Sequence, residues 1–245
     1  MMTYHFTGKN HHQTILFVPG LGANLSQFEE QHHYFDKNYQ VLSITLPHKP
    51  NYTLENMADD IISLLDELQI ETIHFVGNSM GGNIGYELLT KYPLKINSLT
   101  TFGTTPYLRT HKLIVLMAQM FIKIMPLYVI AKIGSYTGVN KTSRQKIYEM
   151  FMHLSKTSLY VTLPHIANFD YRQIIKEIEK PLCVIRAEED ENINRFLDNM
   201  IAIWKKEPWF ILFEIENAGH FTNLDNPLNF NKNLEVFLKS INAKT

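Results

Sequence analysis

The chain has 245 residues, of which 45% are hydrophobic and 19% are charged. This length is normal for one large α/β domain, and the hydrophobic content is enough to bury a sizeable core. The 23 Lys and Arg residues nearly balance the 24 Asp and Glu residues, which leaves a formal net charge of −1. Averaged over the chain, this balance excludes the basic footprint of a nucleic-acid-binding protein and gives no signal for an anionic membrane. We therefore expect no nucleic-acid partner.

The sequence gives no signal for a disulfide or a metal centre. The single cysteine, Cys183, lies in an apolar run and has no partner for an internal disulfide. The His11-His12 and His32-His33 pairs lack the accompanying Cys or His spacing of a metal site. We expect no metal, and the chemistry inferred below requires no organic cofactor.

Two segments bear on where in the cell the protein is located. The first ten residues lack the basic and apolar regions of a signal peptide, so we expect a cytoplasmic protein. Apolar residues dominate 113–133, but Lys123, Pro126 and Lys132 interrupt them. The uncharged run is shorter than the roughly 20 residues of a membrane-spanning helix. We predict two amphipathic helices there and no integral membrane segment.

In chain order, short β-branched runs alternate with helical periodicity up to residue 106 and again after residue 181. The helical period is clearest in 54–68, where apolar residues recur every three or four positions. We predict strands at Thr14–Val18, Val41–Thr45, Thr72–Val76, Ser98–Phe102, Leu182–Ile185 and Phe210–Ile215, and helices at Leu54–Leu68, Ser79–Tyr92, Ile193–Trp204 and Leu228–Leu238. Tyr4–Phe6 is expected to pair with Thr14–Val18 in a hairpin. The alternation predicts an α/β fold with a mostly parallel, doubly wound sheet.

Residues 107–170 interrupt this alternation. Helical, Met-rich and aromatic segments follow Tyr107, and no convincing strand appears through Ile166. We therefore predict a helical cap at 107–170, inserted into a core made of residues 1–106 and 171–245.

The junction Gly77-Asn78-Ser79-Met80-Gly81 carries the chemical signal. It places a serine where a predicted strand turns directly into a predicted helix. Such a turn strains the backbone at the serine, requires small residues two positions before and after it, and exposes the hydroxyl above the sheet. In this strand–turn–helix context the pattern predicts a nucleophile elbow with Ser79 as the nucleophile.

A serine hydroxyl needs a base, and in this architecture the acid and the base follow the serine at the ends of later strands. His220 comes just after the strand Phe210–Ile215, so we predict that it is the base. Glu188, Glu189 and Asp190 all follow the strand Leu182–Ile185. We choose Asp190 because it lies furthest beyond the strand, where a loop can carry it to His220. Its carboxylate would fix the imidazole tautomer and stabilise the imidazolium.

Two backbone amides are candidates for the oxyanion hole. Met80 follows the nucleophile at a helix N-terminus, where its N–H can stabilise negative charge. The second donor is expected in the loop Pro19-Gly20-Leu21-Gly22, whose glycines let the backbone approach a substrate. We predict the Leu21 N–H for this role.

At these positions the sequence resembles the α/β-hydrolase superfamily over nearly its whole length. Within it, the sequence looks most like lid-bearing esterases, thioesterase-like enzymes, cofactor-free haloperoxidase-like proteins and acylglycerol lipases. The resemblance implies the α/β-hydrolase fold, and the order Ser79, Asp190, His220 is the order of the superfamily. Dehalogenases and epoxide hydrolases of this fold use a carboxylate nucleophile, so Ser79 excludes both branches. The matching segments are Pro19-Gly20-Leu21-Gly22, Tyr52–Asp60, Gly77–Gly82, Phe102–Pro106, Ala187–Asp190 and Ala218-Gly219-His220.

The apolar cap predicts the kind of substrate. Leu113, Met117, Met120 and Phe121 are expected to contact it, since flexible Met side chains suit adaptable apolar pockets. We predict a serine hydrolase that cleaves a carboxylic ester or thioester with an apolar acyl or aryl group. One alternative is C–C bond hydrolysis, perhydrolysis or a lyase reaction on the same triad, because fold does not fix function. The other is a non-catalytic ligand-binding receptor on this fold.

Overall fold

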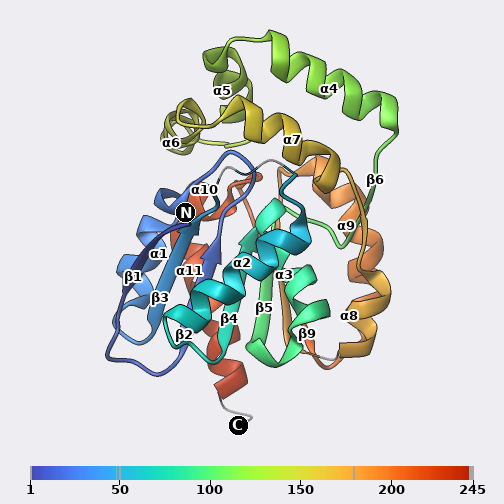
Figure 1. The fold of residues 1–245 in the computed structure, drawn as a ribbon. Helices are drawn as coiled ribbons and strands as arrows, with labels where there is room; N and C mark the ends of the chain where they lie inside the picture. Colours follow the sequence, from blue (N-terminus) through green and yellow to red (C-terminus); the bar gives the residue numbers. More distant parts are fainter. Residues whose placement is uncertain (1, 48, 50, 179, 243–245) are drawn as a thin grey trace.

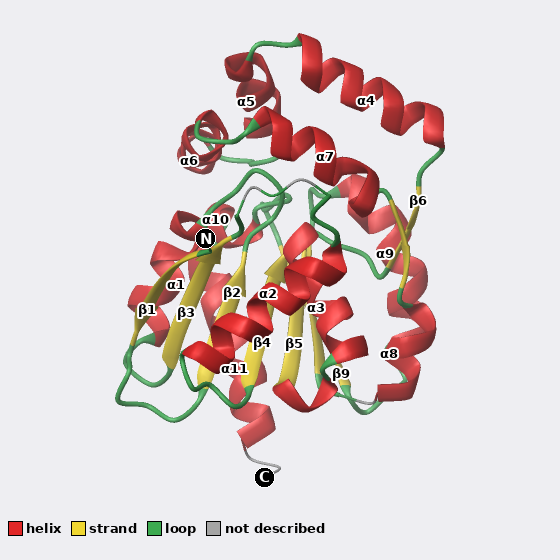
Figure 2. Cartoon of the chain, in the orientation of Figure 1, coloured by secondary structure: helices red, strands yellow, loops and turns green. Residues whose placement is uncertain are grey.

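A seven-stranded sheet forms the centre of the computed structural model, with helices on both of its faces (Figures 1 and 2). The structure describes residues 2–47, 49, 51–178 and 180–242. The strand order is β1-β3-β2-β4-β5-β8-β9, and each neighbouring pair is parallel except β1 with β3. The predicted α/β class and mostly parallel sheet are therefore confirmed. The strands are β1 (Thr3–Thr7), β2 (Thr14–Val18), β3 (Gln40–Thr45), β4 (Ile73–Asn78), β5 (Ile96–Phe102), β8 (Leu182–Ala187) and β9 (Phe210–Ile215).

The predicted hairpin between the first two strands is wrong. Strand β1 pairs antiparallel with β3, so that Thr3 lies opposite Thr45, and it does not pair with β2. Both edges of β2 are occupied by the parallel neighbours β3 and β4, and all five of its residues are buried. The half-exposed β1 instead closes one edge of the sheet.

Two apolar clusters attach the helices to the sheet. One cluster contains side chains of α2 (Leu54–Glu67), α3 (Met80–Lys91), α8 (Arg172–Ile178) and α9 (Glu191–Trp204). The other contains side chains of α1 (Glu29–Phe35) and α11 (Pro227–Asn242). The short helix α10 (Thr222–Asp225) precedes α11, and short 3₁₀ turns lie at Leu25–Phe28 and Pro93–Lys95.

Residues 107–170 form a separate layer over the carboxyl ends of the parallel strands (Figure 1). The layer contains α4 (Lys112–Ile124), α5 (Leu127–Ser135), α6 (Lys141–Met152) and α7 (Lys156–Ile166). Its two ends pair as a short antiparallel ribbon of β6 (Tyr107–Arg109) and β7 (Asn168–Asp170). The β6 strand was not expected from the sequence, because three residues are too few for an alternating pattern to show.

The predicted break at Pro126 is confirmed. Pro126 separates α4 from α5 and immediately precedes the first residue of α5. In the described part of the chain, no helix is both long enough and apolar enough to cross a membrane. Helix α4 packs on α7, and α5 packs on α6.

Candidate active site

Ser79 lies at the corner where β4 turns directly into α3. Its backbone has φ 52° and ψ −118°, a conformation that side-chain-bearing residues rarely adopt. Such backbone strain costs on the order of 1–3 kcal/mol and persists only where the surroundings enforce it. Here the Ser79 N–H donates to the Phe102 carbonyl at 2.9 Å, and the Ser79 carbonyl accepts from the Asn83 N–H at 3.2 Å. The sheet and the first turn of α3 therefore hold the serine in the strained turn.

The two glycines that flank Ser79 are required by close backbone contacts. A Cβ atom on Gly77 would lie 2.5 Å from the Gly81 carbonyl oxygen. A Cβ atom on Gly81 would lie 2.2 Å from the carbonyl oxygen of Val18 in β2. The spacing of small residues seen in the sequence thus follows from how tightly the turn passes over the neighbouring strand.

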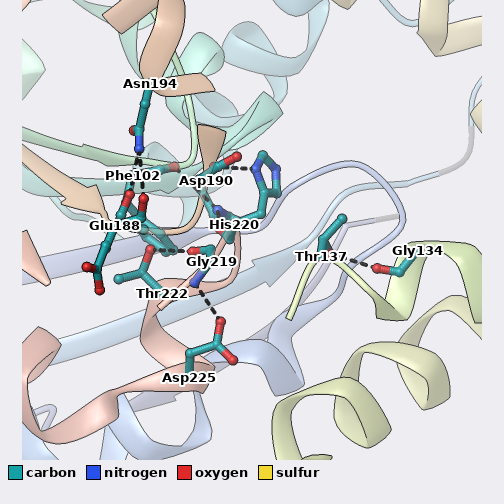
Figure 3. Close-up of polar contacts among 12 residues, drawn as sticks. Phe102, Gly134, Thr137, Glu188, Asp190, Asn194, Gly219, His220, Thr222 and Asp225 are labelled. Carbon is teal, nitrogen blue, oxygen red and sulfur yellow. Dashed lines mark hydrogen bonds and ion pairs between the residues drawn. The ribbon is translucent and has the colours of Figure 1, made fainter. Parts of the chain in front are cut away.

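Asp190 and His220 are in direct contact. An Asp190 carboxylate oxygen lies 2.8 Å from Nδ1 of His220, and the Asp190 side chain is 8% exposed (Figure 3). An ionised carboxylate only accepts hydrogen bonds, so the Nδ1 proton points to Asp190 and the lone pair is left on Nε2. This is the tautomer that a general base needs.

The structure separates the three carboxylates that follow β8. Glu188 accepts the N–H of Asn217 at 2.9 Å, at an exposed site. Glu189 donates its own N–H to the Ala218 carbonyl at 2.9 Å. Of the three carboxylates, Asp190 is the one that the structure brings to His220.

Asn78, which precedes the elbow serine, holds the His220 loop. The Asn78 amide group is buried and donates to the His220 carbonyl at 3.0 Å. It also accepts a hydrogen bond from Gln27 at 3.2 Å, and the same Gln27 group donates to Asn223 at 3.1 Å. Asn223 lies three residues after His220, so this buried amide network ties the serine turn to the histidine loop. The sequence reasoning missed these residues, although Asn78 stands inside the elbow motif.

The cap reaches the same loop from the other side (Figure 3). The His220 N–H donates to the Thr137 carbonyl at 3.1 Å. Asp225 accepts the Gly219 N–H at 2.9 Å through one oxygen and the Val139 N–H at 2.8 Å through the other. One carboxylate therefore connects the loop between α5 and α6 to the residue before His220. Sequence reasoning missed Asp225 as well, because a lone Asp in a short polar segment carries no pattern.

The two predicted oxyanion donors lie beside the serine. Met80 is the first residue of α3, so its N–H has no acceptor within the helix. A Cβ atom on Gly20 would lie 3.1 Å from Cβ of Ser79, which shows how closely the loop that carries Leu21 passes the serine. Leu21 and Met80 line the same cleft, whereas His220 and Asp190 line a second pocket together with Arg144.

That cleft has a volume of about 270 Å³ between the core and the cap. The core contributes the Gly20–Leu21 loop, the end of β3 with the residues that follow it, Tyr52 just before α2, and Met57 in α2. The cap contributes α6, α7 and the turn between them. Most of the lining side chains are apolar: Pro19, Leu21, Ala23, Leu46, Pro47, Tyr52, Met57, Met80, Met150 and Leu154, accompanied by Asn24, Thr45, His153, Ser158 and Thr162.

Tyr52 adds a fixed polar group to the cleft wall. Its hydroxyl donates to Asp60 at 2.6 Å, and the Lys49 ammonium group contacts the same carboxylate. Burial, together with the hydrogen bond to Asp60, raises the pKa of Tyr52 far above its ordinary value. The hydroxyl therefore stays neutral and engaged with Asp60.

The four cap residues expected to contact the substrate lie elsewhere. Leu113, Met117, Met120 and Phe121 are 38–62% exposed on α4, and none of them lines the cleft. Helix α4 packs on α7, and α7 itself borders the cleft, so α4 forms the outer part of the cap (Figure 1). Apolar periodicity identifies an apolar helix face, but it does not say which neighbour that face contacts.

Within the described residues, no group of three or more His, Cys, Asp or Glu side chains is arranged to hold a metal ion.

The profile of the α/β hydrolase fold family matches residues 13–129, which include the elbow and the loop at Leu21. Together with the strand order, this match identifies the fold. The chain has the α/β-hydrolase fold. The superfamily's order of nucleophile, acid and base fits the order of Ser79, Asp190 and His220 in this chain.

Similar proteins cover most of this chain. The 3-oxoadipate enol-lactonase 2 of Acinetobacter baylyi is 25% identical, and the alignment covers 98% of this chain and 94% of that protein. A putative 2-succinyl-6-hydroxy-2,4-cyclohexadiene-1-carboxylate synthase of Bacillus subtilis is 23% identical, and the alignment covers 78% of this chain and 74% of that protein. A thermophilic esterase from Thermogutta terrifontis superposes with a TM-score of 0.87 at 18% identity, covering 98% of this chain and 93% of that one. At this identity the structural likeness shows the fold alone.

Proposed function

We propose that this chain is a serine hydrolase that cleaves carboxylic esters or thioesters with an apolar acyl or aryl group. Ser79 would be the nucleophile, His220 the general base and Asp190 its partner. The observation that carries the proposal is the pairing of a strained serine turn with a His220–Asp190 contact, joined through Asn78. We further propose that residues 107–170 act as a cap over a core made of 1–106 and 171–245.

In the proposed mechanism, Nε2 of His220 takes the Ser79 proton while Oγ attacks the acyl carbonyl carbon. The Leu21 and Met80 N–H groups then hold the negative oxygen of the tetrahedral intermediate, and removal of one such donor typically costs about 10²–10³ in rate. His220 protonates the leaving oxygen or sulfur as the acyl bond breaks. Water, deprotonated by His220, attacks the acyl-enzyme and releases the acid.

The lining of the cleft supports an uncharged, apolar acyl or aryl group. No Lys or Arg occurs among the described residues that line this cleft, and the one Arg beside the proposed base is Arg144, in the pocket that His220 and Asp190 line. Its volume of about 270 Å³ lies just under the usual range of about 300–1,000 Å³ for ligand pockets. We therefore expect short or medium acyl groups to be preferred over long chains.

The relatives support ester chemistry and also keep a rival open. The A. baylyi protein is named as a lactonase, and a lactone is a cyclic ester. The T. terrifontis protein is named as an esterase. The B. subtilis protein is named as a synthase, which favours a lyase-type reaction as the second candidate. Its named product is a carboxylate, and Arg144, in the pocket that His220 and Asp190 line, is a candidate cation to bind one.

The test is pre-steady-state hydrolysis of p-nitrophenyl esters of increasing acyl length. We expect a burst of about one p-nitrophenol per chain, turnover that is highest for short or medium chains, and neither in Ser79→Ala. A matched control is Ser158→Ala, which alters the cleft wall without touching the proposed triad. Absence of ester turnover in a folded wild-type protein would favour a lyase or a ligand-binding receptor instead.

A further inference from the structure

The face of α4 that points away from the rest of the protein is apolar. The other face of α4 contacts the rest of the cap. There Gln119 donates to the Tyr160 carbonyl of α7 at 2.9 Å, and Ile122 is buried against Ile130 and Leu154. On the remaining surface of the helix lie Leu113, Ile114, Met117, Met120, Phe121 and Ile124, each 38–66% exposed. A surface helix normally turns a polar face outward. Helix α4 does the reverse.

This face, hereafter the outer cap face, concentrates the exposed hydrophobic surface of the chain. Ten of the 17 large hydrophobic side chains that are exposed among the described residues fall between 113 and 136. Contiguous exposed apolar patches of this kind mark an interaction site in a folded protein. Figure 1 shows α4 at the outer end of the cap, remote from the sheet.

The cap also carries an excess of positive charge. Residues 107–148 contain seven Lys or Arg residues and no Asp or Glu. Outside 107–170 the chain has 15 basic and 22 acidic residues, so the balanced net charge conceals a cationic cap on an acidic core. Lys112 and Lys123 lie at the two ends of α4, and both are exposed. Within the described residues, neither lysine forms an ion pair.

We propose that the outer cap face docks on an anionic phospholipid surface. An interfacial helix places its apolar side chains among the acyl chains while flanking Lys residues contact the anionic headgroups. The length of α4 and its two lysines do not allow it to span a bilayer, so the helix would lie in the plane of the surface. A symmetric contact between two copies is disfavoured, because it would bring two cationic caps together.

This inference does not depend on the proposed chemistry of Ser79. It does place the cleft close to the lipid, because α7 contacts α4 on one side and contributes Ser158 and Thr162 to the cleft on the other. An apolar ester dissolved in the bilayer would thus be one helix layer away from the cleft.

The test is sedimentation with vesicles of phosphatidylcholine alone and of equimolar phosphatidylcholine and phosphatidylglycerol. We expect binding to the anionic vesicles, and a loss of about tenfold or more in the double variant Met117→Glu, Met120→Glu. Both side chains are more than half exposed, so the fold is unaffected; circular dichroism checks this. The matched control is Leu94→Glu with Leu228→Glu, which places the same two charges on apolar core residues that are 86% and 58% exposed and should bind like the wild type.

Charge-reversal variants test the electrostatic part of the proposal. Lys112→Glu with Lys123→Glu should weaken binding to anionic vesicles, and raised salt should weaken the wild type in the same direction. Absence of wild-type binding to anionic vesicles, or equal binding by the Met117→Glu, Met120→Glu variant, would overturn the proposal. So would light scattering that shows a dimer in the absence of lipid, dissociated by the α4 variant, because a second copy would then cover the face.

Discussion

The carboxylate of Asp190 lies 2.8 Å from Nδ1 of His220, although 30 residues separate them in the chain. In Asp190→Asn the negative charge is lost and an amide N–H can donate to Nδ1, which favours the wrong imidazole tautomer. We expect Asp190→Asn to lower kcat by on the order of 10⁴, with little change in the urea midpoint, as for equivalent carboxylates in serine triads. Glu188→Gln is the control, since Glu188 contacts the Asn217 N–H rather than His220, and it should keep nearly full activity. Similar losses in both variants would refute the assignment of Asp190.

Asp225 is expected to act as a positioning residue for His220. Asp225→Ala removes the acceptor for the N–H groups of Gly219 and Val139, and unpaired groups of this kind cost about 1–3 kcal/mol each. Because the site is half-exposed, water compensates in part, and we expect a loss of about 2 kcal/mol in the free energy of unfolding. Urea denaturation measures this loss, and steady-state kinetics should show that kcat falls while KM changes little.

Two variants separate a positioning role of Asp225 from a general loss of stability. Asp225→Asn keeps one acceptor oxygen and should recover much of the lost kcat. Asp66→Ala removes an exposed ion pair with Lys95 and should cost no more than about 0.5 kcal/mol. Unchanged kcat in the destabilised Asp225→Ala protein would show that the contact is purely structural.

The strain at Ser79 can be separated from its chemistry. Ser79→Ala removes the hydroxyl but keeps a Cβ atom at φ 52°, whereas glycine adopts positive φ without that strain. Glycine relieves the strain but costs chain entropy on folding. From the difference between these two effects, we expect Ser79→Gly to be more stable than Ser79→Ala by about 1 kcal/mol. Both variants should be inactive. Thermal or urea unfolding measures the difference, and equal stabilities would mean that the turn stores no strain.

Two buried histidines make the stability of the protein depend on pH. Desolvation lowers the pKa of His32 to about 4, with repulsion from His5 and His33 adding to the effect, and burial lowers the pKa of His74 to about 4. Below the ordinary pKa of 6.5, the unfolded chain takes up protons that the folded protein does not. The stability that the two neutral histidines contribute is therefore fully present above pH 6.5, and it falls as the pH decreases toward 4.

The size of this effect gives a direct test. Each histidine contributes a slope of up to about 1.4 kcal/mol per pH unit in this window. His74→Gln should remove one of the two contributions and keep a polar partner for Ser98, whose hydroxyl lies 2.8 Å from Nδ1 of His74. Urea titrations between pH 5 and 7 measure the slope, and an unchanged slope in His74→Gln would contradict the account.

The elements of the core could be predicted because the periodicity and punctuation of the sequence are local. The elbow is the clearest case: Gly77 and Gly81 are needed by contacts within a few residues and on the next strand, so the pattern is visible in the sequence itself. The pairing of β1 with β3 was missed, because strand order depends on which edges are already occupied.

The support of the site could not be predicted for a related reason. Gln27 contacts Asn78 across 51 residues and Asn223 across 196, and amide side chains carry no sequence period. The cap shows the same limit. Its helices were expected, but the apolar face of α4 points outward rather than into the cleft. The net charge was equally uninformative, because averaging the whole chain hides the cationic cap.

The central claim, that Ser79 is an acyl-transfer nucleophile, is tested most directly by labelling with a fluorophosphonate probe and mapping the modified peptide by mass spectrometry. We expect one label per chain on the peptide that contains Ser79, slower labelling in Asp190→Asn and none in Ser79→Ala. A folded wild-type protein that stays unlabelled, or a label on another residue, would contradict it.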